Sequence, residues 1–309
     1  MISQGMGVYL RGIAMGAADL VPGVSGGTIA LITGIYSRLI AALASLGPST
    51  FAMLMRGRVV DAWRAIDGYF LLMLSAGIAT AVIGLAALLD WLLSNYPLPL
   101  WAGFSGLVLA SSWSLVGSNY HRWMTKEWLL FTGGIGVALF VGLTGAVQLP
   151  VTPLGVFFAG CIAICAMILP GISGSFLLLL MGMYEPVIKA LVSVDLLTLT
   201  FFALGCAVGL LLFSRLLQGL LRVAEQITMA TLLGFLVGSL IILWPWQLSV
   251  STVLDRHGDL RYVQTLPVTP VYYAEHVGDP MLLLCFACFI FGALVVTVLQ
   301  VLSVKREES

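Results

Sequence analysis

The sequence predicts an all-α, polytopic membrane protein built from two repeats of inverted topology. Of the 309 residues, 60% are hydrophobic and only 9% are charged, whereas about a quarter of the residues in a soluble domain are charged. A second observation is the segment 128–184, which contains no Asp, Glu, Lys or Arg. A third is the internal duplication described below. Because a water-soluble fold could not hide this much apolar surface, we expect a multi-pass membrane protein.

Six apolar segments have the length that a spanning helix requires, which is about 20 residues. They are 69–89, 97–117, 128–147, 196–214, 228–246 and 281–302. Two further apolar regions, 6–46 and 153–192, are interrupted near the middle by Pro-Gly. We therefore expect each half of the chain to contain one broken segment followed by three spanning helices.

The two interrupted regions repeat each other at a constant spacing. The segment 21–26 reads Val-Pro-Gly-Val-Ser-Gly and recurs at 169–174 as Leu-Pro-Gly-Ile-Ser-Gly, an offset of 148 residues. Tyr36 recurs at the same offset as Tyr184. A pattern that repeats without a slip indicates an internal duplication.

A second match extends this duplication toward the C-terminus. The Gly-Phe pair at 103–104 recurs at 234–235, an offset of 131 residues. The duplication predicts two repeats, residues 1–150 and 151–309.

Each broken segment is predicted to be a re-entrant hairpin. The stretch 25–36 would form about 18 Å of helix, which crosses little more than half of a ~30 Å hydrocarbon core. In the second half, Pro186 is expected to end the matching helix. Because a hairpin returns to its starting side, each half makes three crossings, and the two halves then have opposite orientations in the membrane.

The basic residues predict that both termini lie in the cytoplasm. With this orientation, eleven of the 14 Lys and Arg residues fall on the cytoplasmic side, which is the expected positive-inside bias. The three on the other side are Lys189, Arg256 and Arg261. The longest polar loop, 247–280, then lies outside, and we expect a periplasmic lid or an irregular surface loop.

The two breaks predict a shared anion site near the middle of the membrane. Irregular backbone at that depth is tolerated only inside protein or beside a wet cavity, and paired breaks are typical of a transporter's binding site. A serine stands at the N-cap position of each tip, ahead of helix N–H groups that attract an anion. The alternative role for these small residues is close helix packing. The predicted binding residues at the tips are Pro22, Gly23, Ser25, Gly26, Gly27, Thr28, Pro170, Gly171, Ser173, Gly174 and Ser175.

Ionisable residues in these segments are further candidates, because burying a charge in a membrane is costly. Asp19 is the main candidate for coupling transport to a proton or cation, and its alternative role is a structural partner of Arg11. Arg38 is predicted to guide an anionic headgroup, with a snorkelling interfacial arginine as the alternative. Glu185 completes the coupling candidates with Asp19 and Arg11, unless it pairs with Lys189 one turn away.

The block at 16–28, Gly-Ala-Ala-Asp-Leu-Val-Pro-Gly-Val-Ser-Gly-Gly-Thr, and the later segment 169–175 resemble the polyprenyl-phosphate transporter (PopT) family. The resemblance runs over essentially the whole chain. It implies a transporter of the bacterial inner membrane that returns undecaprenyl phosphate from the periplasmic to the cytoplasmic leaflet. This lipid is the carrier on which peptidoglycan and other envelope polymers are made. The predicted site is compatible, because the lipid tail can stay in the bilayer while the headgroup crosses.

Other functional classes fit less of the sequence. A secondary transporter of a small soluble anion would use the same hairpins, and the sequence leaves this alternative open. A serine protease is disfavoured, because the Gly-x-Ser-Gly motif occurs twice, at 23–26 and 171–174, with no histidine predicted near either copy. Paired dead-end hairpins argue against an open channel.

Cofactor and metal chemistry is not expected. The pair Cys285-x-x-Cys288 has the spacing of a metal or redox motif, but no His, Asp or Glu lies close to it in the helix. No phosphate-cradling Walker-type loop is present in the sequence. We therefore expect a transporter with no enzymatic activity, no cofactor and no metal, whose partners are a lipid, the membrane and a coupling proton or sodium ion, and no nucleic acid.

Overall fold

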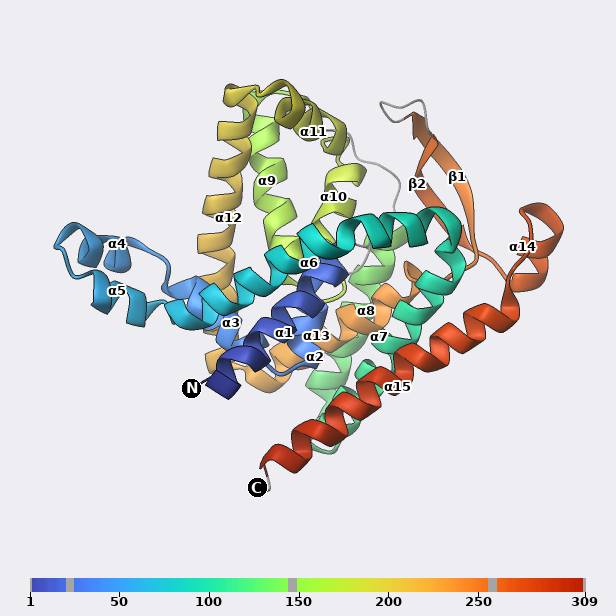
Figure 1. The fold of residues 1–309 in the computed structure, drawn as a ribbon, viewed down its shortest axis with the longest axis horizontal. Coiled ribbons are helices and arrows are strands. Elements are labelled where there is room, and N and C mark those ends of the chain that lie inside the picture. Colours follow the sequence, from blue (N-terminus) through green and yellow to red (C-terminus); the bar gives the residue numbers. More distant parts are fainter. Residues whose placement is uncertain (1, 21–24, 144–148, 255–259, 308–309) are drawn as a thin grey trace. The chain divides into compact units, whose positions relative to one another are not determined.

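The structure is a computed structural model, and it describes residues 2–20, 25–143, 149–254 and 260–307. Within these ranges the chain is mainly helical, and its strands form one two-stranded ribbon (Figure 1). By Cα packing it divides into two compact units. Unit 1 comprises Met1–Ala86 and Ala146–Met229, and unit 2 comprises Ala87–Gly145 and Ala230–Ser309. Each unit therefore combines a part of the first half of the sequence with a part of the second.

The helices of unit 1 come from both halves of the duplicated sequence. They are α1 (Ile2–Asp19), α2 (Gly26–Ile32), α3 (Tyr36–Ser45), α4 (Pro48–Met55), α5 (Val59–Ala65), most of α6 (Gly68–Asn95), α9 (Pro153–Ile168), α10 (Gly174–Leu180), α11 (Tyr184–Ser193), α12 (Leu196–Val223) and the start of α13 (Glu225–Gly238). Unit 2 holds the end of α6, the rest of α13, and α7 (Pro97–Asn119), η1 (Tyr120–Arg122), α8 (Thr125–Leu143), η2 (Ser239–Ile241), β1 (Gln247–Leu254), β2 (Leu260–Pro267), α14 (Pro270–His276) and α15 (Leu282–Glu307).

Four helices of the described chain are long and apolar enough to cross a membrane: α6, α7, α8 and α12. Two bent pairs, α3 with α4 at 56° and α10 with α11 at 110°, bring the total to six if each pair is one span. The last two predicted spans correspond to shorter apolar stretches, Glu225–Ile241 and Leu282–Thr297. The predicted class, an all-α multi-pass membrane protein, is thus confirmed.

The helices that follow the two tips are shorter than predicted. The expected helix over 25–36 is interrupted at Gly34, which has a φ of 73°. The amide of Ile35 donates to the carbonyl oxygen of Ala30 at 3.0 Å, as in a Schellman cap. Gly182, with a φ of 66°, follows α10 in the same way. A left-handed residue cannot continue a right-handed helix, so each tip helix has only 7 residues.

Pro186 has a different role from the predicted one. It is the third residue of α11, which continues to Ser193. Because the first N–H groups of a helix have no intrahelical partner, a proline at this position removes no hydrogen bond. The prediction that Pro186 ends a helix is therefore wrong.

The helix bounds repeat between the two halves of the sequence. Helices α2 and α3 have the same lengths as α10 and α11, and 174 minus 26 and 184 minus 36 both equal 148. Helices α6 and α12 each have 28 residues, and 196 minus 68 equals 128. The offset falls because α4 and α5 occur between α3 and α6, with no helix between α11 and α12. The duplication thus extends to the folded elements, while the opposite orientation of the halves stays a prediction.

Glycines bring helices into backbone contact in both parts of unit 1. A Cβ on Gly12 in α1 would meet the carbonyl oxygen of Leu74 in α6, and a Cβ on Gly160 in α9 would meet that of Phe202 in α12. Gly160 and Phe202 are the counterparts of Gly12 and Leu74 at offsets of 148 and 128. Figure 1 shows α9 and α12 side by side. Such close approach is typical of small residues between membrane helices.

Thiols reinforce the contact between α9 and α12. The Sγ of Cys161 donates to the carbonyl oxygen of Gly205 at 3.0 Å, and that of Cys206 donates to Gly160 at 3.5 Å. These cysteines therefore serve as small packing residues with a weak donor.

Unit 2 uses matching glycines between α7 and α15 and between α13 and α8. A Cβ on Gly106 would meet the carbonyl oxygen of Phe289, and a Cβ on Gly234 would meet that of Phe131. Because both glycines pack against a phenylalanine carbonyl, Gly234 is the structural counterpart of Gly106, and 234 minus 106 equals 128. The predicted match with Gly103, at an offset of 131, is wrong by three residues. Because three residues are nearly one helical turn, both glycines lie on similar faces of α7.

The polar segment 247–280 contains regular structure. Strands β1 and β2 are antiparallel, with Gln247 opposite Pro267 and Leu254 opposite Leu260, and α14 follows them. The expectation of an irregular surface loop is therefore wrong for the described part of this segment. Its role as a periplasmic lid stays a prediction.

Replacing Gly205 with valine is expected to destabilise the protein by about 1–3 kcal/mol, because a core cannot absorb extra volume without strain. A Cβ at this position would overlap the carbonyl oxygen of Phe157 in α9. Gly219 in the same helix has open space at its Cβ position, so Gly219→Val is the matched control. Thermal unfolding in detergent gives the comparison, and equal Tm values for the two variants would contradict the packing described here.

Candidate functional site

Serine caps begin the two short helices that follow the breaks in unit 1. The Oγ of Ser25 accepts from the amide of Gly27 at 3.1 Å, and the Oγ of Ser173 accepts from the amide of Phe176 at 3.5 Å. Both serines are buried and have the extended backbone of an N-cap residue. The predicted N-cap role of these serines is confirmed.

The first tip is hydrogen-bonded to the backbone of the second break. The hydroxyl of Ser25 lies 3.2 Å from the carbonyl oxygens of both Met167 and Leu169. The amide of Gly171 donates to the Oγ1 of Thr28 at 2.9 Å. Because both hydroxyl groups belong to buried residues, these bonds form away from water and hold the two breaks together.

A tyrosine of α3 adds to this contact. The hydroxyl of Tyr36 donates to the carbonyl oxygen of Ile168 at 3.1 Å, and its ring is almost fully buried. A Cβ on Gly27 would lie 2.7 Å from the same oxygen. The two breaks, more than 130 residues apart in sequence, therefore meet through polar groups with no room for a further side-chain carbon.

Asp19 at the end of α1 reaches the start of α2. Its Oδ1 accepts from the amide of Gly26 at 2.6 Å, and a Cβ on Gly26 would lie 2.6 Å from its Oδ2. An acidic group at a helix N-terminus is stabilised by the free N–H groups there. The carboxylate thus acts as a second cap for α2, beside Ser25.

The tips enclose a small cavity of about 80 Å³. That volume exceeds what a single water requires by several fold. Asp19, Ser25, Met167, Ser173, Gly174 and Ser175 line it. With the 148-residue offset, Asp19 matches Met167 and Ser25 matches Ser173. The cavity thus combines equivalent positions from the two repeats, of which the first supplies a carboxylate and the second a thioether.

The charge of Asp19 decides what this cavity can hold. Of the six described residues that line it, Asp19 alone carries a charge. Two like unit charges 4 Å apart repel by about 4 kcal/mol at an effective dielectric constant of 20. An anion therefore fits here best when a proton or a cation neutralises Asp19.

The structure brings together most, but not all, of the predicted tip residues. Pro22 and Gly23 lie outside the described residues. Met167 was missed, although the repeat offset from Asp19 could have identified it. Of the predicted residues, Asp19, Ser25, Ser173, Gly174 and Ser175 line the cavity. Gly26 and Gly27 donate to Asp19 and Ser25 in its wall, Thr28 and Gly171 are bonded to each other, and Pro170 is buried in the second break.

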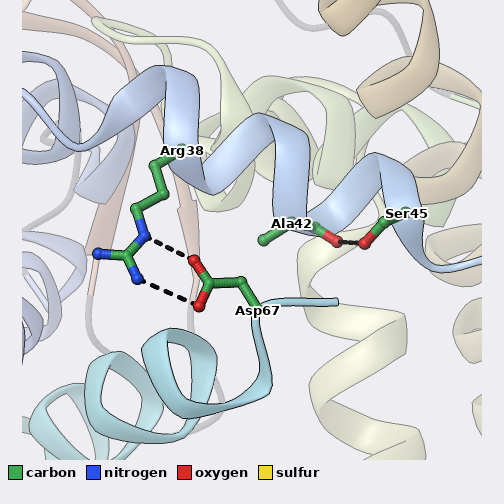
Figure 2. Close-up of polar contacts among 4 residues, drawn as sticks. All are labelled: Arg38, Ala42, Ser45 and Asp67. Atoms are coloured by element: carbon green, nitrogen blue, oxygen red, sulfur yellow. Dashed lines mark hydrogen bonds and ion pairs between the residues drawn. The ribbon is translucent and has the colours of Figure 1, made fainter. Parts of the chain in front are cut away.

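Arg38 does not line the tip cavity. Its guanidinium forms a two-bond ion pair with Asp67, with distances of 2.6 Å from Nε and 3.1 Å from Nη2, and Figure 2 shows the two side chains facing each other. The guanidinium carbon also lies 4.3 Å from the ring centre of Phe70. Both charged side chains are about half exposed, so Arg38 joins α3 to the start of α6 at a partly exposed position.

Asp67 was missed in the sequence, and its counterpart behaves differently. At an offset of 128, Asp67 matches Asp195, which caps α12. The hydroxyl of Thr198 donates to Asp195 at 2.7 Å, and this hydrogen bond holds the pKa of Asp195 below its usual value. The first half thus uses the equivalent carboxylate to bind Arg38.

The remaining predicted pairs are not formed among the described residues. Asp19 makes no ion pair with Arg11 there, and its carboxylate accepts from the Gly26 amide. Glu185 and Lys189 are both exposed and form no ion pair in the described part of α11. Arg11 and Glu185 therefore stay predictions as coupling residues.

Comparison with known proteins gives a consistent result. The family model described as "Undecaprenyl phosphate translocase-like" matches residues 15–261. A "Polyprenyl-phosphate transporter" of Vibrio cholerae serotype O1 is 42% identical over 275 residues, covering 89% of each chain. A protein of the same name from Staphylococcus aureus is 34% identical over 253 residues, covering 76% of this chain and 85% of the relative. No solved structure matches significantly.

The family match covers both breaks, and the relatives align over most of their length. The match therefore includes every described residue that lines the tip cavity. The chain belongs to the undecaprenyl phosphate translocase-like family of membrane transporters.

Proposed function

We propose that this protein returns undecaprenyl phosphate from the periplasmic to the cytoplasmic leaflet of the bacterial inner membrane, where it is reused for envelope polymer synthesis. The observation that carries the proposal is the polar cavity between the two repeated breaks, in a chain whose relatives are named polyprenyl-phosphate transporters. The protein would move the lipid without making or breaking a covalent bond in it.

The substrate's own chemistry explains why such a small polar site is sufficient. The polyprenyl chain is at home in the bilayer, so only the phosphate needs a path across it. Desolvating a charged group costs far more than moving hydrocarbon within a membrane. The serine hydroxyls and tip amides would replace part of the water that the phosphate loses.

The predicted orientation supports access to the site from both sides of the membrane. The bias of eleven basic residues against three supports the prediction that both termini lie in the cytoplasm. With three crossings in each half, the repeats 1–150 and 151–309 would be inverted, and the tips would be reached alternately from either side.

We propose that a proton, or a sodium ion, accompanies the phosphate by neutralising Asp19. Phosphate and ionised Asp19 would repel each other in the cavity, so anion binding favours the neutralised carboxylate. By linkage, the bound phosphate favours proton uptake to the same extent. An inward proton gradient would then drive the headgroup toward the cytoplasm.

A flipping assay in proteoliposomes tests this function. We expect fluorescently labelled undecaprenyl phosphate to change leaflets faster with the protein than without it, and faster again with an imposed proton gradient. Uptake of inorganic phosphate or a small organic anion, with no lipid flipping, would instead favour a secondary transporter of small soluble anions.

Replacing both Ser25 and Ser173 with valine is expected to reduce binding of undecaprenyl phosphate by about tenfold or more, since two hydroxyls worth about 1 kcal/mol each are lost from the cavity. Binding in detergent by microscale thermophoresis gives the comparison. Replacing both Thr269 and Tyr272, in the segment 247–280, with valine is the control. An equal loss of affinity in the two double variants would count against the tip site.

A further inference from the structure

A second, larger cavity lies in unit 2, along the side of the α7–α15 pair. Its volume is about 570 Å³, within the range of small-molecule sites. Its walls come from the end of α6, the first half of α7 and the facing part of α15. Key lining residues are Trp91, Tyr96, Leu107, Cys288 and Phe291.

Glycine contacts hold the two walls of this groove in place. A Cβ on Gly292 in α15 would overlap the carbonyl oxygen of Gly103 in α7, and both glycines also line the groove. One turn on, Gly106 makes the same kind of contact with Phe289. Figure 1 shows α7 and α15 side by side. Because the backbones touch here, the groove is set by helix packing and not by loosely placed side chains.

We infer that this groove holds a segment of the substrate's polyprenyl chain. The inference rests on the proposed function, which supplies a substrate with a long uncharged hydrocarbon tail. None of the residues that line the groove is charged, and nearly all of its surface is carbon. A phosphate or another polar group would lose its water here without gaining a partner, whereas a methyl-branched chain matches such walls in polarity.

The aromatic residues at one end of the groove are consistent with a polyprenyl chain as its occupant. The rings of Trp91 and Tyr96 lie 5.6 Å apart at the junction of α6 and α7, and such pairs are typical of the membrane–water interface. In the predicted orientation this junction faces the periplasm, the side from which the substrate is taken. At the 128-residue offset the second half has Gly219 and Ala224 instead, so the aromatic end belongs to the first repeat alone.

The chain length of the ligand gives a direct test. We would measure binding of geranyl, farnesyl and undecaprenyl phosphate to the full protein in detergent. Because the tail leaves a micelle and not water, only better packing favours the groove, and we expect undecaprenyl phosphate to bind about fivefold to tenfold more tightly than geranyl phosphate. Leu107→Trp, which fills the groove, should abolish this gain, so that geranyl and undecaprenyl phosphate bind with similar affinity. Leu109→Trp, on an exposed face of α7 outside the groove, should keep the gain.

A photoreactive undecaprenyl phosphate, with a diazirine on its chain, gives a second readout in the unsubstituted protein. We expect peptides from α7 and α15 that line the groove to be labelled, and excess undecaprenyl phosphate to prevent the labelling. Retention of the chain-length gain in Leu107→Trp, or equal labelling by a diazirine phospholipid that undecaprenyl phosphate does not displace, would overturn the inference. If no polyprenyl phosphate binds at all, the proposed function fails, which is a distinct result.

Discussion

Replacing Asp19 with asparagine is expected to reduce proton-driven flipping of undecaprenyl phosphate by about tenfold or more, the loss of some 1.4 kcal/mol of coupling, while the protein still inserts and folds. Asparagine retains the Oδ1 that accepts from the amide of Gly26, so the cap of α2 should persist. It cannot bind a proton in the relevant pH range, so the coupling between proton and phosphate would be lost.

The measurement is the flipping rate in proteoliposomes with and without an inward proton gradient. Met167→Leu is the matched control, because Met167 occupies the equivalent position in the second repeat, lines the same cavity and carries no charge. It should leave the response to the gradient intact. A rate in Asp19→Asn that rises with the gradient as much as in the unsubstituted protein would remove Asp19 from the coupling mechanism.

Replacing Gly27 with valine is expected to abolish transport and to destabilise unit 1 by about 2–4 kcal/mol, the sum of overpacking and of lost buried hydrogen bonds. Its Cβ would lie 2.7 Å from the carbonyl oxygen of Ile168, too close for a carbon atom. Separating α2 from the second break would also weaken the bonds that Ser25 and Tyr36 donate to that backbone.

Gly7 in α1 provides the control for this substitution, because nothing lies within 4 Å of its Cβ position. Gly7→Val should keep the melting temperature and the flipping rate close to those of the unsubstituted protein. Tm in detergent separates a folding defect from a transport defect. A Gly27→Val protein that transports at the normal rate would show that the contact between the tips is dispensable.

Some parts of the fold followed directly from local sequence. Apolar length predicted α6, α7, α8 and α12, because a spanning segment must satisfy its backbone within one helix. The serine N-caps were also predictable, since the residue ahead of a helix needs a side-chain acceptor. The break at Gly34 was not, because a glycine in an apolar run is equally compatible with a helix interior and with a cap.

Charged partners were harder to predict. Arg11 was a plausible partner for Asp19 by helical spacing, yet the carboxylate turns to the amide of Gly26 across the break. Arg38 was predicted to guide an anionic headgroup, which stays a prediction, and its ion pair with Asp67, 29 residues away, was not foreseen. Both contacts depend on which segment of the chain the tertiary fold brings next to the charged side chain. Helical periodicity does not specify that segment.

Composition and the repeated Pro-Gly motif by themselves determined that this chain is a membrane protein with duplicated broken segments, because apolar length and helix-breaking residues act locally. Only the tertiary structure decided that Ser25, Thr28 and Tyr36 bond the second break and that Asp19 shares a cavity with Met167. Those contacts join residues more than 130 positions apart. Their formation depends on how the glycine-lined helices pack, and packing is a property of the whole unit.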